Sequence, residues 1–370
     1  MKRIAITGAS GLLGWHLRSR LLAAGTATVV IVPRDAWTDV DELSRIVRSC
    51  DVVVHLAGMN RGPGSDVERV NVDLAETLVR ACRLGDISPH VIFSSSIHAE
   101  KDTPYGRGKR AAEGVLTGWA AEQGAPCLIL RLPHVFGECG RPFHNSVVST
   151  FCHQLATGEE PRIDHDGALE LLHAQDVARL ILDAVADCTV GELRPQGREM
   201  KVSEALERLR DLHRAYREGF IPRFEERIDL PLFNTLRSYM FPEAYPILVP
   251  LRTDDRGSLF ELVKTQHGGQ AFASTTNPAV TRGEHFHLSK VERFAVLRGQ
   301  ARIRVRRLFD STVHAFDVDG AEPALVDMPT LHTHNITNVG KSELITLFWS
   351  HTPFDPQHPD TYREPVEDTR

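Results

Sequence analysis

Long apolar runs are missing from this sequence of 370 residues, in which no stretch approaches the roughly 20 apolar residues that a membrane-spanning helix needs. Met1-Lys2-Arg3 leads directly into a short apolar stretch, which does not have the pattern of a secretory signal. We therefore expect neither a membrane span nor a signal peptide, and a cytoplasmic location.

Paired cysteines are missing as well. The six cysteines are Cys50, Cys82, Cys127, Cys139, Cys152 and Cys188. None of them forms a C-x-x-C pair, so we interpret them as small apolar residues of a reducing compartment rather than as disulfides or metal ligands.

An excess of basic charge is also absent, because 43 lysines and arginines stand against 49 acidic residues, for a formal net charge of -6. This balance excludes a nucleic-acid-binding stripe and a polybasic membrane patch, so small anionic ligands must bind at local sites. The length is sufficient for two domains. We expect a first domain over residues 1–246 and a second over residues 247–370. The reason is that Pro242 and Pro246 interrupt the chain and that helical periodicity disappears beyond Leu251.

The first domain begins with a strand, a glycine-rich turn and a helix. The segment from Arg3 reads R-I-A-I-T-G-A-S-G-L-L-G, with three glycines at the spacing G-x-x-G-x-x-G. In such a turn the glycines permit unusual backbone angles and a close approach of a pyrophosphate, while the helix N-terminus attracts the phosphates. A glycine-rich turn without a ligand is the alternative, which the position after the first strand disfavours. The residues expected to bind the cofactor are Gly8, Gly11, Leu12, Leu13 and Gly14.

Strands and helices alternate after this turn and predict an α/β fold with a doubly wound, Rossmann-like parallel sheet. We expect strands over 27–32, 51–58, 90–96 and 128–131, and helices over 67–84 and 105–123. Arg34 follows the second strand, where an arginine attracts the additional phosphate of NADP, so we predict NADPH; a solvated loop arginine is the alternative. Leu56 and Ala57, at the end of the third strand, are expected to lie beside the cofactor.

A tyrosine and a lysine follow the strand that ends in Ser94-Ser95-Ser96. Tyr105 and Lys109 stand at i and i+4 and share a helix face, so the ammonium can lie beside the phenol. A nearby cation lowers the pKa of a phenol and prepares it to exchange a proton with a substrate oxygen, which a serine hydroxyl can hydrogen-bond. Ser96 is a better candidate than Ser95, because neighbouring residues of a strand face opposite ways.

Together, the segments 7–14, 94–96 and 105–109 resemble the extended short-chain dehydrogenase/reductase superfamily, whose members mostly act on nucleotide sugars. The resemblance implies that Tyr105 is the proton donor, with Lys109 as its partner and Ser96 as the carbonyl anchor. Sugar-nucleotide dehydratases of this superfamily carry an Asp-Glu pair after the strand hydroxyl, whereas Ile97-His98 stands here. The sequence therefore favours reduction or epimerisation over elimination of water.

A polar loop follows the segment 133–137, which resembles the place where the chain leaves the cofactor for the sugar nucleotide. It carries Arg141 and Asn145. A guanidinium suits a diphosphate and an amide suits a uracil edge, so we expect both residues to bind substrate. A polar loop without this role is an equally good alternative.

Short strands separated by turn signals begin beyond Leu251 and predict an all-β barrel or jelly roll. They are expected over 259–264, 271–275, 293–297, 301–306, 314–318 and 344–349. His285 and His287 are two residues apart and can face the same side of a strand. With Glu292 and His334 they offer three imidazoles and one carboxylate, a set suited to a divalent transition metal such as zinc.

These histidines resemble the two cupin motifs, G-x5-H-x-H-x4-E-x6-G and P-x-G-x2-H-x3-N. The first match runs from Gly283 to Gly299 and the second from Pro329 to Asn338. Leu331 replaces the glycine of the second motif. We therefore expect that turn to be built differently, with an effect on the position of His334.

The whole chain resembles a family of bacterial capsule-biosynthesis enzymes that join an extended reductase to a C-terminal cupin. The resemblance includes Asp254-Asp255-Arg256-Gly257 at the junction and Pro359-Asp360-Thr361-Tyr362 near the end. It implies that the cupin domain epimerises C3 of a 4-keto-6-deoxy UDP-N-acetylhexosamine and that the reductase domain then reduces C4 with NADPH, giving a UDP-6-deoxy-L-talosamine type of product on the route to UDP-N-acetyl-L-fucosamine. The proton at C3 is acidic only while the C4 ketone exists, so epimerisation must come first. His332 and His351 are candidates for the base that removes it.

Two alternatives are compatible with the sequence. One is a reductase of another nucleotide-linked keto-deoxysugar, with a cupin that is structural or mediates dimerisation. The other is a regulator that senses a nucleotide sugar, and Ser96, Tyr105 and Lys109 argue against it because a sensor needs no proton donor. We expect a homodimer or a higher homo-oligomer, because cupins often pair through exposed strands.

Overall fold

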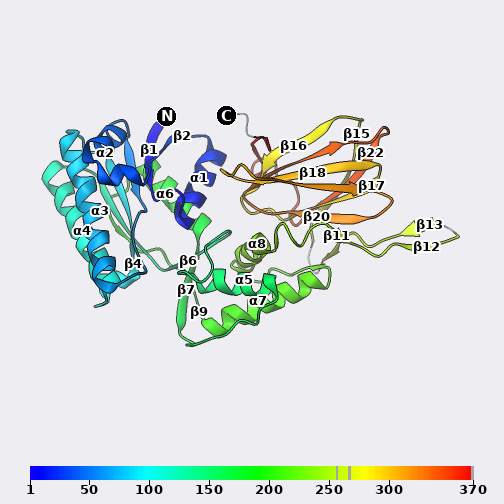
Figure 1. Cartoon of the computed structure of the whole chain (residues 1–370), viewed down its shortest axis with the longest axis horizontal. Helices are drawn as coiled ribbons and strands as arrows, with labels where there is room; N and C mark the ends of the chain where they lie inside the picture. Colours follow the sequence, from blue (N-terminus) through cyan, green and yellow to red (C-terminus); the bar gives the residue numbers. More distant parts are fainter. Residues whose placement is uncertain (256, 266–267, 368–370) are drawn as a thin grey trace. The chain divides into compact units, whose positions relative to one another are not determined.

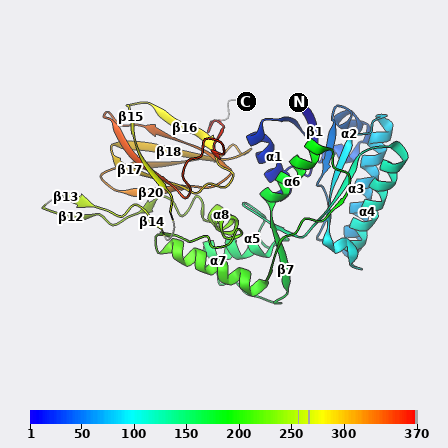
Figure 2. The ribbon, with the colours of Figure 1, turned by 180° about the vertical axis from the view of Figure 1, so that it is seen from behind.

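The chain divides into two compact units. The computed structural model describes residues 1–255, 257–265 and 268–367, so Arg256 of the junction motif lies outside the described residues. The first unit comprises Met1–Thr150 and His165–Val202, and the second comprises Phe151–Asp164 and Ser203–Arg370. Figures 1 and 2 show a sheet with helices on both faces in the first unit and a β-rich second unit. In the described ranges, no helix is both long and apolar enough to cross a membrane.

A six-stranded parallel sheet forms the centre of the first unit, in the order β2-β1-β3-β4-β5-β8. Its strands are β1 (Lys2–Thr7), β2 (Ala27–Ile31), β3 (Val52–His55), β4 (His90–Ser96), β5 (Cys127–Leu132) and β8 (Gly191–Leu193). The order reverses between β1 and β3, and doubly wound sheets bind ligands outside the carboxyl ends of the strands at such a point. The predicted Rossmann-like sheet is confirmed.

Helices cover both faces of this sheet because apolar side chains alternate along its strands. Ala5, Val91 and Phe93 pack on one face against α2 (Val40–Val47), α3 (Gly64–Leu84) and α4 (Pro104–Gln123). Ile4, Ile6 and Ile92 pack on the other face against α1 (Leu12–Ala24) and α6 (Ala174–Asp187). These strand residues are 2 % exposed or less, so the sheet is a rigid support for the loops at its carboxyl edge.

The start of α4 places the tyrosine and lysine of the predicted site. Thr103 caps this helix, because its hydroxyl accepts the Gly106 N–H at 3.1 Å, and Pro104 suits the first turn, where its missing N–H costs nothing. The helix ends at Gln123, and Gly124 follows with a φ of +61°. Its predicted range, 105–123, is therefore one residue short at the N-terminus.

Smaller elements complete the first unit. A second sheet, in the order β6-β7-β9, contains β6 (His134–Phe136), β7 (Ala168–His173) and β9 (Arg198–Lys201). Short 3-10 helices are η1 (Asp35–Thr38) and η2 (Ile97–Glu100), and α5 (Val147–Thr157) is divided between the two units.

Two five-stranded antiparallel sheets form the barrel of the second unit and confirm the predicted cupin-type jelly roll. One contains β11 (Ile247–Leu248), β20 (Ala324–Met328), β17 (Glu292–Arg298), β22 (Leu344–Ser350) and β15 (Gln270–Thr276), in this order. The other contains β19 (Val313–Asp319), β18 (Gln300–Arg307), β21 (His332–Asn338), β16 (Thr281–Phe286) and β23 (Tyr362–Arg363). Apolar side chains fill the space between them, including Phe294, Ile303, Ile336 and Phe348.

Residues 259–264 were predicted to form one strand, and this prediction is wrong. Leu259 ends β13 (Gly257–Leu259), which pairs with β12 (Arg252–Asp254) as a hairpin. Lys264 begins β14 (Lys264–Thr265), which pairs with β10 (Phe220–Ile221). The residues between β13 and β14 form no strand.

Two helices that lie within the predicted first domain, residues 1–246, belong to the second compact unit: α7 (Val202–Arg217), apart from its first residue, and α8 (Asp229–Met240). The reason is a buried polar cluster. The Tyr216 hydroxyl donates to Asp327 Oδ2 at 2.6 Å and lies 2.8 Å from the Tyr245 hydroxyl, while Arg293 donates to both oxygens of Asp327 at 2.6 and 2.8 Å. This cluster joins α7 to β17 and β20. A compact unit of the structure need not have the same limits as a domain defined from the sequence, so the domain boundary at 246/247 stays a prediction.

Candidate functional site

The glycine-rich turn after β1 brings the predicted cofactor residues together. Thr7 Oγ1 accepts the N–H groups of Leu56 and Ala57, each at 3.0 Å, which joins this turn to the end of β3. Gly8 has a φ of +66°, and a Cβ there would lie 2.9 Å from Ala57 N. A Cβ on Gly14 would overlap the carbonyl of Gly8. Only glycines allow this close packing of turn, strand and helix.

The first turn of α1 suits an anionic group. Gly11 precedes the helix without a side-chain cap, so the N–H groups that begin with Leu12 and Leu13 are available to a phosphate. Arg34 is exposed directly after β2, at the N-terminus of η1. The geometry therefore suits the predicted dinucleotide, and the individual binding roles stay predictions.

The structure brings the three predicted catalytic residues to the carboxyl end of β4. Tyr105 lies near enough to Ser96 for the Ser96 hydroxyl to lower the pKa of the phenol, and Lys109 Nζ donates to Ser94 O at 2.8 Å. The Lys109 ammonium lies 5.9 Å from the centre of the Tyr105 ring. Ser95 points the other way and donates to Glu113, as expected for a neighbour on a strand.

The pKa values in this cluster differ from the sequence-based expectation in one respect. Burial raises the pKa of Tyr105, and the Ser96 hydroxyl only partly opposes it. The expected lowering by Lys109 is therefore wrong for this structure, in which the ammonium lies beyond the ring and faces Ser94. Burial also lowers the pKa of Lys109 to about 8, against the opposing charge of Glu113.

Two histidines beside this cluster were missed as candidates. The His98 ring lies 6.4 Å from the Tyr105 ring and 5.6 Å from the His134 ring, between ring centres. Burial lowers the pKa of both histidines, and neighbouring cations add to the effect. The signal for His98 was its place two residues after Ser96, whereas His134 is brought in by β6 and had no sequence signal.

The two predicted substrate residues lie in the loop between β6 and α5. Arg141 and Asn145 are exposed, and in the described part of the chain neither is hydrogen-bonded to Ser96, Tyr105 or Lys109. Burial, Arg141 and Arg61 together lower the pKa of His144 in the same loop. Arg141 and Arg61 are thus the cations close to His144, and substrate binding by Arg141 and Asn145 stays a prediction.

A second polar cluster in the first unit was not predicted. Glu138 is buried between His173, whose Nε2 lies 2.9 Å from Glu138 Oε2, and His16, whose Nε2 lies 3.8 Å from the same oxygen. Burial alone raises the pKa of Glu138, but the two imidazoles outweigh it and lower the pKa to about 2. The carboxylate is therefore ionised at neutral pH.

Hydrogen bonds around this cluster place a proton between His16 and Glu138. Arg20 donates to Gln175 Oε1 at 2.9 Å, so the amide nitrogen of Gln175 faces His16 Nδ1, at 3.1 Å. His16 Nδ1 is then an acceptor, and Nε2 carries the hydrogen and donates it to the main-chain carbonyl of Glu138 at 3.3 Å. Assigned in this way, His16 is a neutral ring held by hydrogen bonds at both nitrogens, and it offers no imidazole lone pair to a metal.

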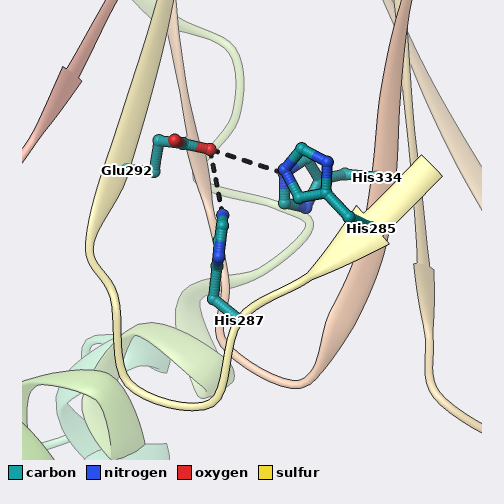
Figure 3. Close-up of side chains that lie close together, drawn as sticks. All are labelled: His285, His287, Glu292 and His334. Carbon is teal, nitrogen blue, oxygen red and sulfur yellow. Dashed lines mark hydrogen bonds and ion pairs between the residues drawn. The ribbon is translucent and has the colours of Figure 1, made fainter. Parts of the chain in front are cut away.

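Four predicted metal ligands meet in the barrel of the second unit. Figure 3 shows His285, His287, Glu292 and His334 pointing toward one another. Their ligand atoms all lie within 4.8 Å of one another. Glu292 Oε2 is 3.1 Å from His287 Nε2 and 3.5 Å from His334 Nε2. Strands β16 and β21 pair directly at these residues, with His285 opposite His334.

The donor set fits a divalent cation. His287 Nδ1 lies 2.5 Å from Asp360 O and His334 Nδ1 lies 3.3 Å from His332 O. Carbonyl oxygens only accept, so both Nδ1 atoms donate, and in the neutral tautomer that this sets the Nε2 lone pairs face the Glu292 carboxylate. The Nε2 of His334 is buried without a hydrogen-bond partner. Lone pairs that face a carboxylate in a buried site call for a cation between them.

In this cluster the Glu292 carboxylate is ionised and the His285 ring is uncharged at neutral pH. Burial raises the pKa of Glu292, but His287 and His334 outweigh it, so the pKa falls well below its usual value. Burial lowers the pKa of His285 to about 3, and repulsion from the other two imidazoles adds to the effect. A carboxylate beside neutral imidazoles is the form that binds a transition metal.

The turn at Leu331 keeps the conformation that a glycine would adopt. Leu331 has a φ of +61° and is fully buried, and its N–H donates to His287 O at 2.8 Å. The expectation that this turn is built differently is therefore wrong. Burial of the leucine side chain offsets about 1–2 kcal/mol of left-handed strain, and His334 stays in the cluster.

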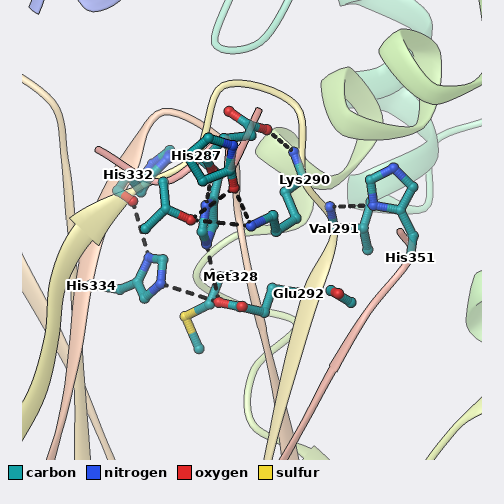
Figure 4. A network of polar contacts seen from close by, with 12 residues as sticks. His287, Lys290, Val291, Glu292, Met328, His332, His334 and His351 are labelled. Carbon is teal, nitrogen blue, oxygen red and sulfur yellow. Dashed lines mark hydrogen bonds and ion pairs between the residues drawn. The ribbon is translucent and has the colours of Figure 1, made fainter. Parts of the chain in front are cut away.

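Two further histidines, the candidates for a base, differ in their hydrogen bonds. His332 Nδ1 donates to Thr330 O at 2.8 Å, which leaves a lone pair on Nε2 of the neutral ring. His351 Nδ1 instead accepts the Val291 N–H at 3.0 Å, so Nε2 of its neutral ring carries the hydrogen (Figure 4).

Two family models match the chain. The NAD dependent epimerase/dehydratase family matches residues 4–194, and the polysaccharide biosynthesis C-terminal domain matches residues 252–362. A UDP-2-acetamido-2,6-beta-L-arabino-hexul-4-ose reductase from Pseudomonas aeruginosa is 33% identical over 366 residues, which cover 97% of this chain and 98% of the relative.

Solved structures match as well. The capsular polysaccharide assembling protein CapF from Staphylococcus aureus has a TM-score of 0.61 at 30% identity, over 98% of this chain and 99% of that chain. The structure of RMD from Pseudomonas aeruginosa complexed with NADPH has a TM-score of 0.56 at 21% identity, over 65% of this chain and 99% of that chain. The second match shows the fold alone.

Proposed function

This chain belongs to the CapF-like family of nucleotide-sugar reductases, and on that premise we propose that it converts a UDP-linked 4-keto sugar in two steps. The barrel epimerises C3 and the first unit then reduces the C4 ketone with NADPH. The substrate is a 4-keto-6-deoxy UDP-N-acetylhexosamine, because the similar reductase from Pseudomonas aeruginosa is named for a UDP-linked hexul-4-ose. The observation that carries the reductase step is the grouping of Ser96, Tyr105 and Lys109 at the carboxyl end of β4.

The reduction needs a proton for the oxygen that becomes the alcohol. The Tyr105 hydroxyl donates this proton, and its raised pKa keeps it protonated and ready at neutral pH. Ser96 hydrogen-bonds the same carbonyl oxygen and orients it toward the tyrosine. Lys109 supplies positive charge beside the phenolate that forms. NADPH, bound by the glycine-rich turn with Arg34 at its 2′-phosphate, would supply the hydride.

The epimerisation must precede the reduction for a chemical reason. The C3 proton is acidic because the adjacent ketone delocalises the charge left behind, and this stabilisation ends when C4 becomes an alcohol. His285, His287, Glu292 and His334 would hold a divalent metal, zinc by ligand type, which as a Lewis acid would polarise a carbonyl oxygen. In this proposal Arg141 and Asn145 bind the UDP group. The reaction takes place in the cytoplasm, where nucleotide sugars and NADPH occur. The protein acts as a homodimer.

A second candidate keeps the reductase and assigns the metal a structural role. The burial of His287, Glu292 and His334 favours it, because a closed metal site stabilises a fold without contacting substrate. In that case the chain reduces another nucleotide-linked keto-deoxysugar and does not exchange the C3 proton.

One experiment separates these functions. We would supply the 4-keto product of a UDP-N-acetylglucosamine 4,6-dehydratase/5-epimerase with NADPH in deuterated water, using wild type, Tyr105→Phe, His287→Ala and, as matched control, His358→Ala at an exposed site. We expect Tyr105→Phe to lower the rate of NADPH oxidation by about 10²–10⁴-fold, and deuterium to appear at C3 in the wild type and His358→Ala but not in His287→Ala. Reduction without deuterium in any variant supports the structural metal. Absence of NADPH oxidation by the wild type contradicts the proposed substrate.

A further inference from the structure

The segment near the C-terminal end lies along the strand that carries one of the metal candidates. β23 pairs with β16 and places Arg363 opposite His285. Further along, the Glu364 N–H donates to Glu284 O at 2.9 Å, and Arg306 Nε donates to Val366 O at 2.6 Å. This segment is therefore the edge of the sheet that presents His285 and His334.

Asp360, just before β23, binds the loop that connects β16 to β17. Its carboxylate accepts three consecutive N–H groups, from Leu288 at 2.8 Å, Ser289 at 2.9 Å and Lys290 at 2.8 Å, and also the Ser289 hydroxyl at 2.8 Å. Hydrogen bonds to an ionised acceptor are roughly twice as strong as neutral ones. One carboxylate thus fixes the backbone of the loop.

That loop sets the distance between two metal candidates, since His287 stands at its start and Glu292 at its end. Helix α8 also holds this loop, because Asn234 donates to Ser289 O at 2.8 Å. Lys290 strengthens the attachment to the tail, donating from Nζ to Pro359 O at 2.6 Å and to Thr361 Oγ1 at 3.1 Å. Figure 4 shows His287, Lys290 and Glu292 within this one network of polar contacts.

The main chain of Asp360 reaches a candidate ligand directly. Its carbonyl accepts the Nδ1–H of His287 at 2.5 Å, which directs the opposite nitrogen, Nε2, toward Glu292. Asp360 has a φ of +41°, a left-handed conformation that aspartate and asparagine adopt more readily than most residues. The side chain, by binding the loop, holds the carbonyl in this orientation.

We propose that Asp360 is a positioning residue of the metal centre, which fixes the tautomer and direction of His287 through its carbonyl and the spacing of His287 and Glu292 through its carboxylate. The inference rests on the metal site of the proposed function. It goes beyond that function because it makes the C-terminal segment part of the centre. Outer partners of this kind change metal affinity by about 10–100-fold.

The test is zinc affinity, measured by competition with a chromophoric chelator on the full-length protein. We expect Asp360→Ala to weaken zinc binding by about 10–100-fold. Asp360→Asn should restore part of the affinity, because an amide oxygen can still accept and asparagine tolerates the left-handed conformation. The matched control is Asp355→Ala: Asp355 lies in the same tail and accepts the Gln357 N–H at 2.9 Å, but has no contact with the loop 287–292.

A second readout separates positioning from folding. In the cobalt-substituted protein, Asp360→Ala should change the visible d–d spectrum, whereas Asp355→Ala should leave it as in the wild type. If Asp360→Ala lowers the midpoint of thermal unfolding in chelator but keeps wild-type zinc affinity and spectrum, the residue is merely structural and the inference is overturned. A wild type that binds no zinc or cobalt overturns it together with the metal site. Wild-type NADPH oxidation, assayed in parallel, shows whether the reductase proposal survives either result.

Discussion

Each unit contains a buried cluster of histidine and glutamate side chains, and the two clusters differ in where their protons lie. In the first unit Glu138 faces His16 and His173, and in the second Glu292 faces His287 and His334. Residue types and distances are similar. The difference comes from the partners of the far ring nitrogen: an amide donor at His16 but carbonyl acceptors at His287 and His334.

This difference teaches that residue type and proximity do not by themselves define a metal site. A donor on Nδ1 forces the hydrogen onto Nε2, so that His16 turns a hydrogen and not a lone pair toward Glu138 and donates it to the Glu138 main-chain carbonyl. An acceptor on Nδ1 forces the hydrogen outward and leaves lone pairs facing the carboxylate, which need a cation. The first cluster is therefore satisfied by the protein, whereas the second would be satisfied by the metal that we propose for it.

The largest expected effect is on the first cluster. Glu138→Gln removes the buried charge that both imidazoles face, so we expect the free energy of unfolding to fall by about 3–5 kcal/mol. Urea titration measures it, with and without zinc. The loss should be the same in both conditions, because this cluster does not bind metal. A loss of stability that appears only with zinc would show that the first cluster binds metal as well, which would contradict the proposed difference between the clusters.

The Glu138 carboxylate should also make the free energy of unfolding depend on pH in the acid range. The pKa of Glu138 is about 2 in the folded protein, whereas the ordinary pKa of a glutamate without partners is 4.5. A lowered carboxyl pKa contributes stability that is present above pH 4.5 and is lost as the pH falls toward 2, which amounts to about 3 kcal/mol. We expect this loss in the wild type and not in Glu138→Gln. Comparing the two cancels the acid sensitivity of other buried groups, such as His55, and equal pH profiles would contradict the assignment.

Sequence patterns predicted the parts of both units that depend on local spacing. β4 has the predicted bounds, 90–96, because its short apolar run continues into three serines that end the strand. The four candidate ligands of the barrel meet as predicted, although His287 follows the end of β16. α8 was missed, since Pro231 breaks its pattern although proline is tolerated in a first turn.

Other features depend on contacts that no local pattern records. Tyr216 binds Asp327, 111 residues away, and this contact groups α7 with the barrel. His287 receives its orientation from Asp360, 73 residues away, and His16 from Gln175, 159 residues away. The tautomers that distinguish the two clusters are set by these distant partners. The sequence therefore predicts which residues lie together but not which nitrogen of each histidine carries the hydrogen.

Zinc should stabilise only the protein whose second cluster is intact. At a free zinc concentration of 100 times Kd, binding to the folded state alone adds about 2.7 kcal/mol to the free energy of unfolding. A chelator should reverse this gain in the wild type, and His287→Ala should show no gain. The control is Glu138→Gln, which should keep the full zinc effect although its baseline is lower.

The smallest effect has the opposite sign from the first and is the sharpest test of the comparison. Glu292→Gln replaces an acceptor by an amide that can donate to the lone pair of His287 or His334, so in chelator we expect the variant to be more stable than the wild type by about 1 kcal/mol. Urea titration in chelator measures this gain, and zinc should no longer stabilise the variant. If Glu292→Gln instead destabilises the metal-free protein, as Glu138→Gln does, the Nε2 atoms carry hydrogens and the second cluster, like the first, is satisfied without a metal.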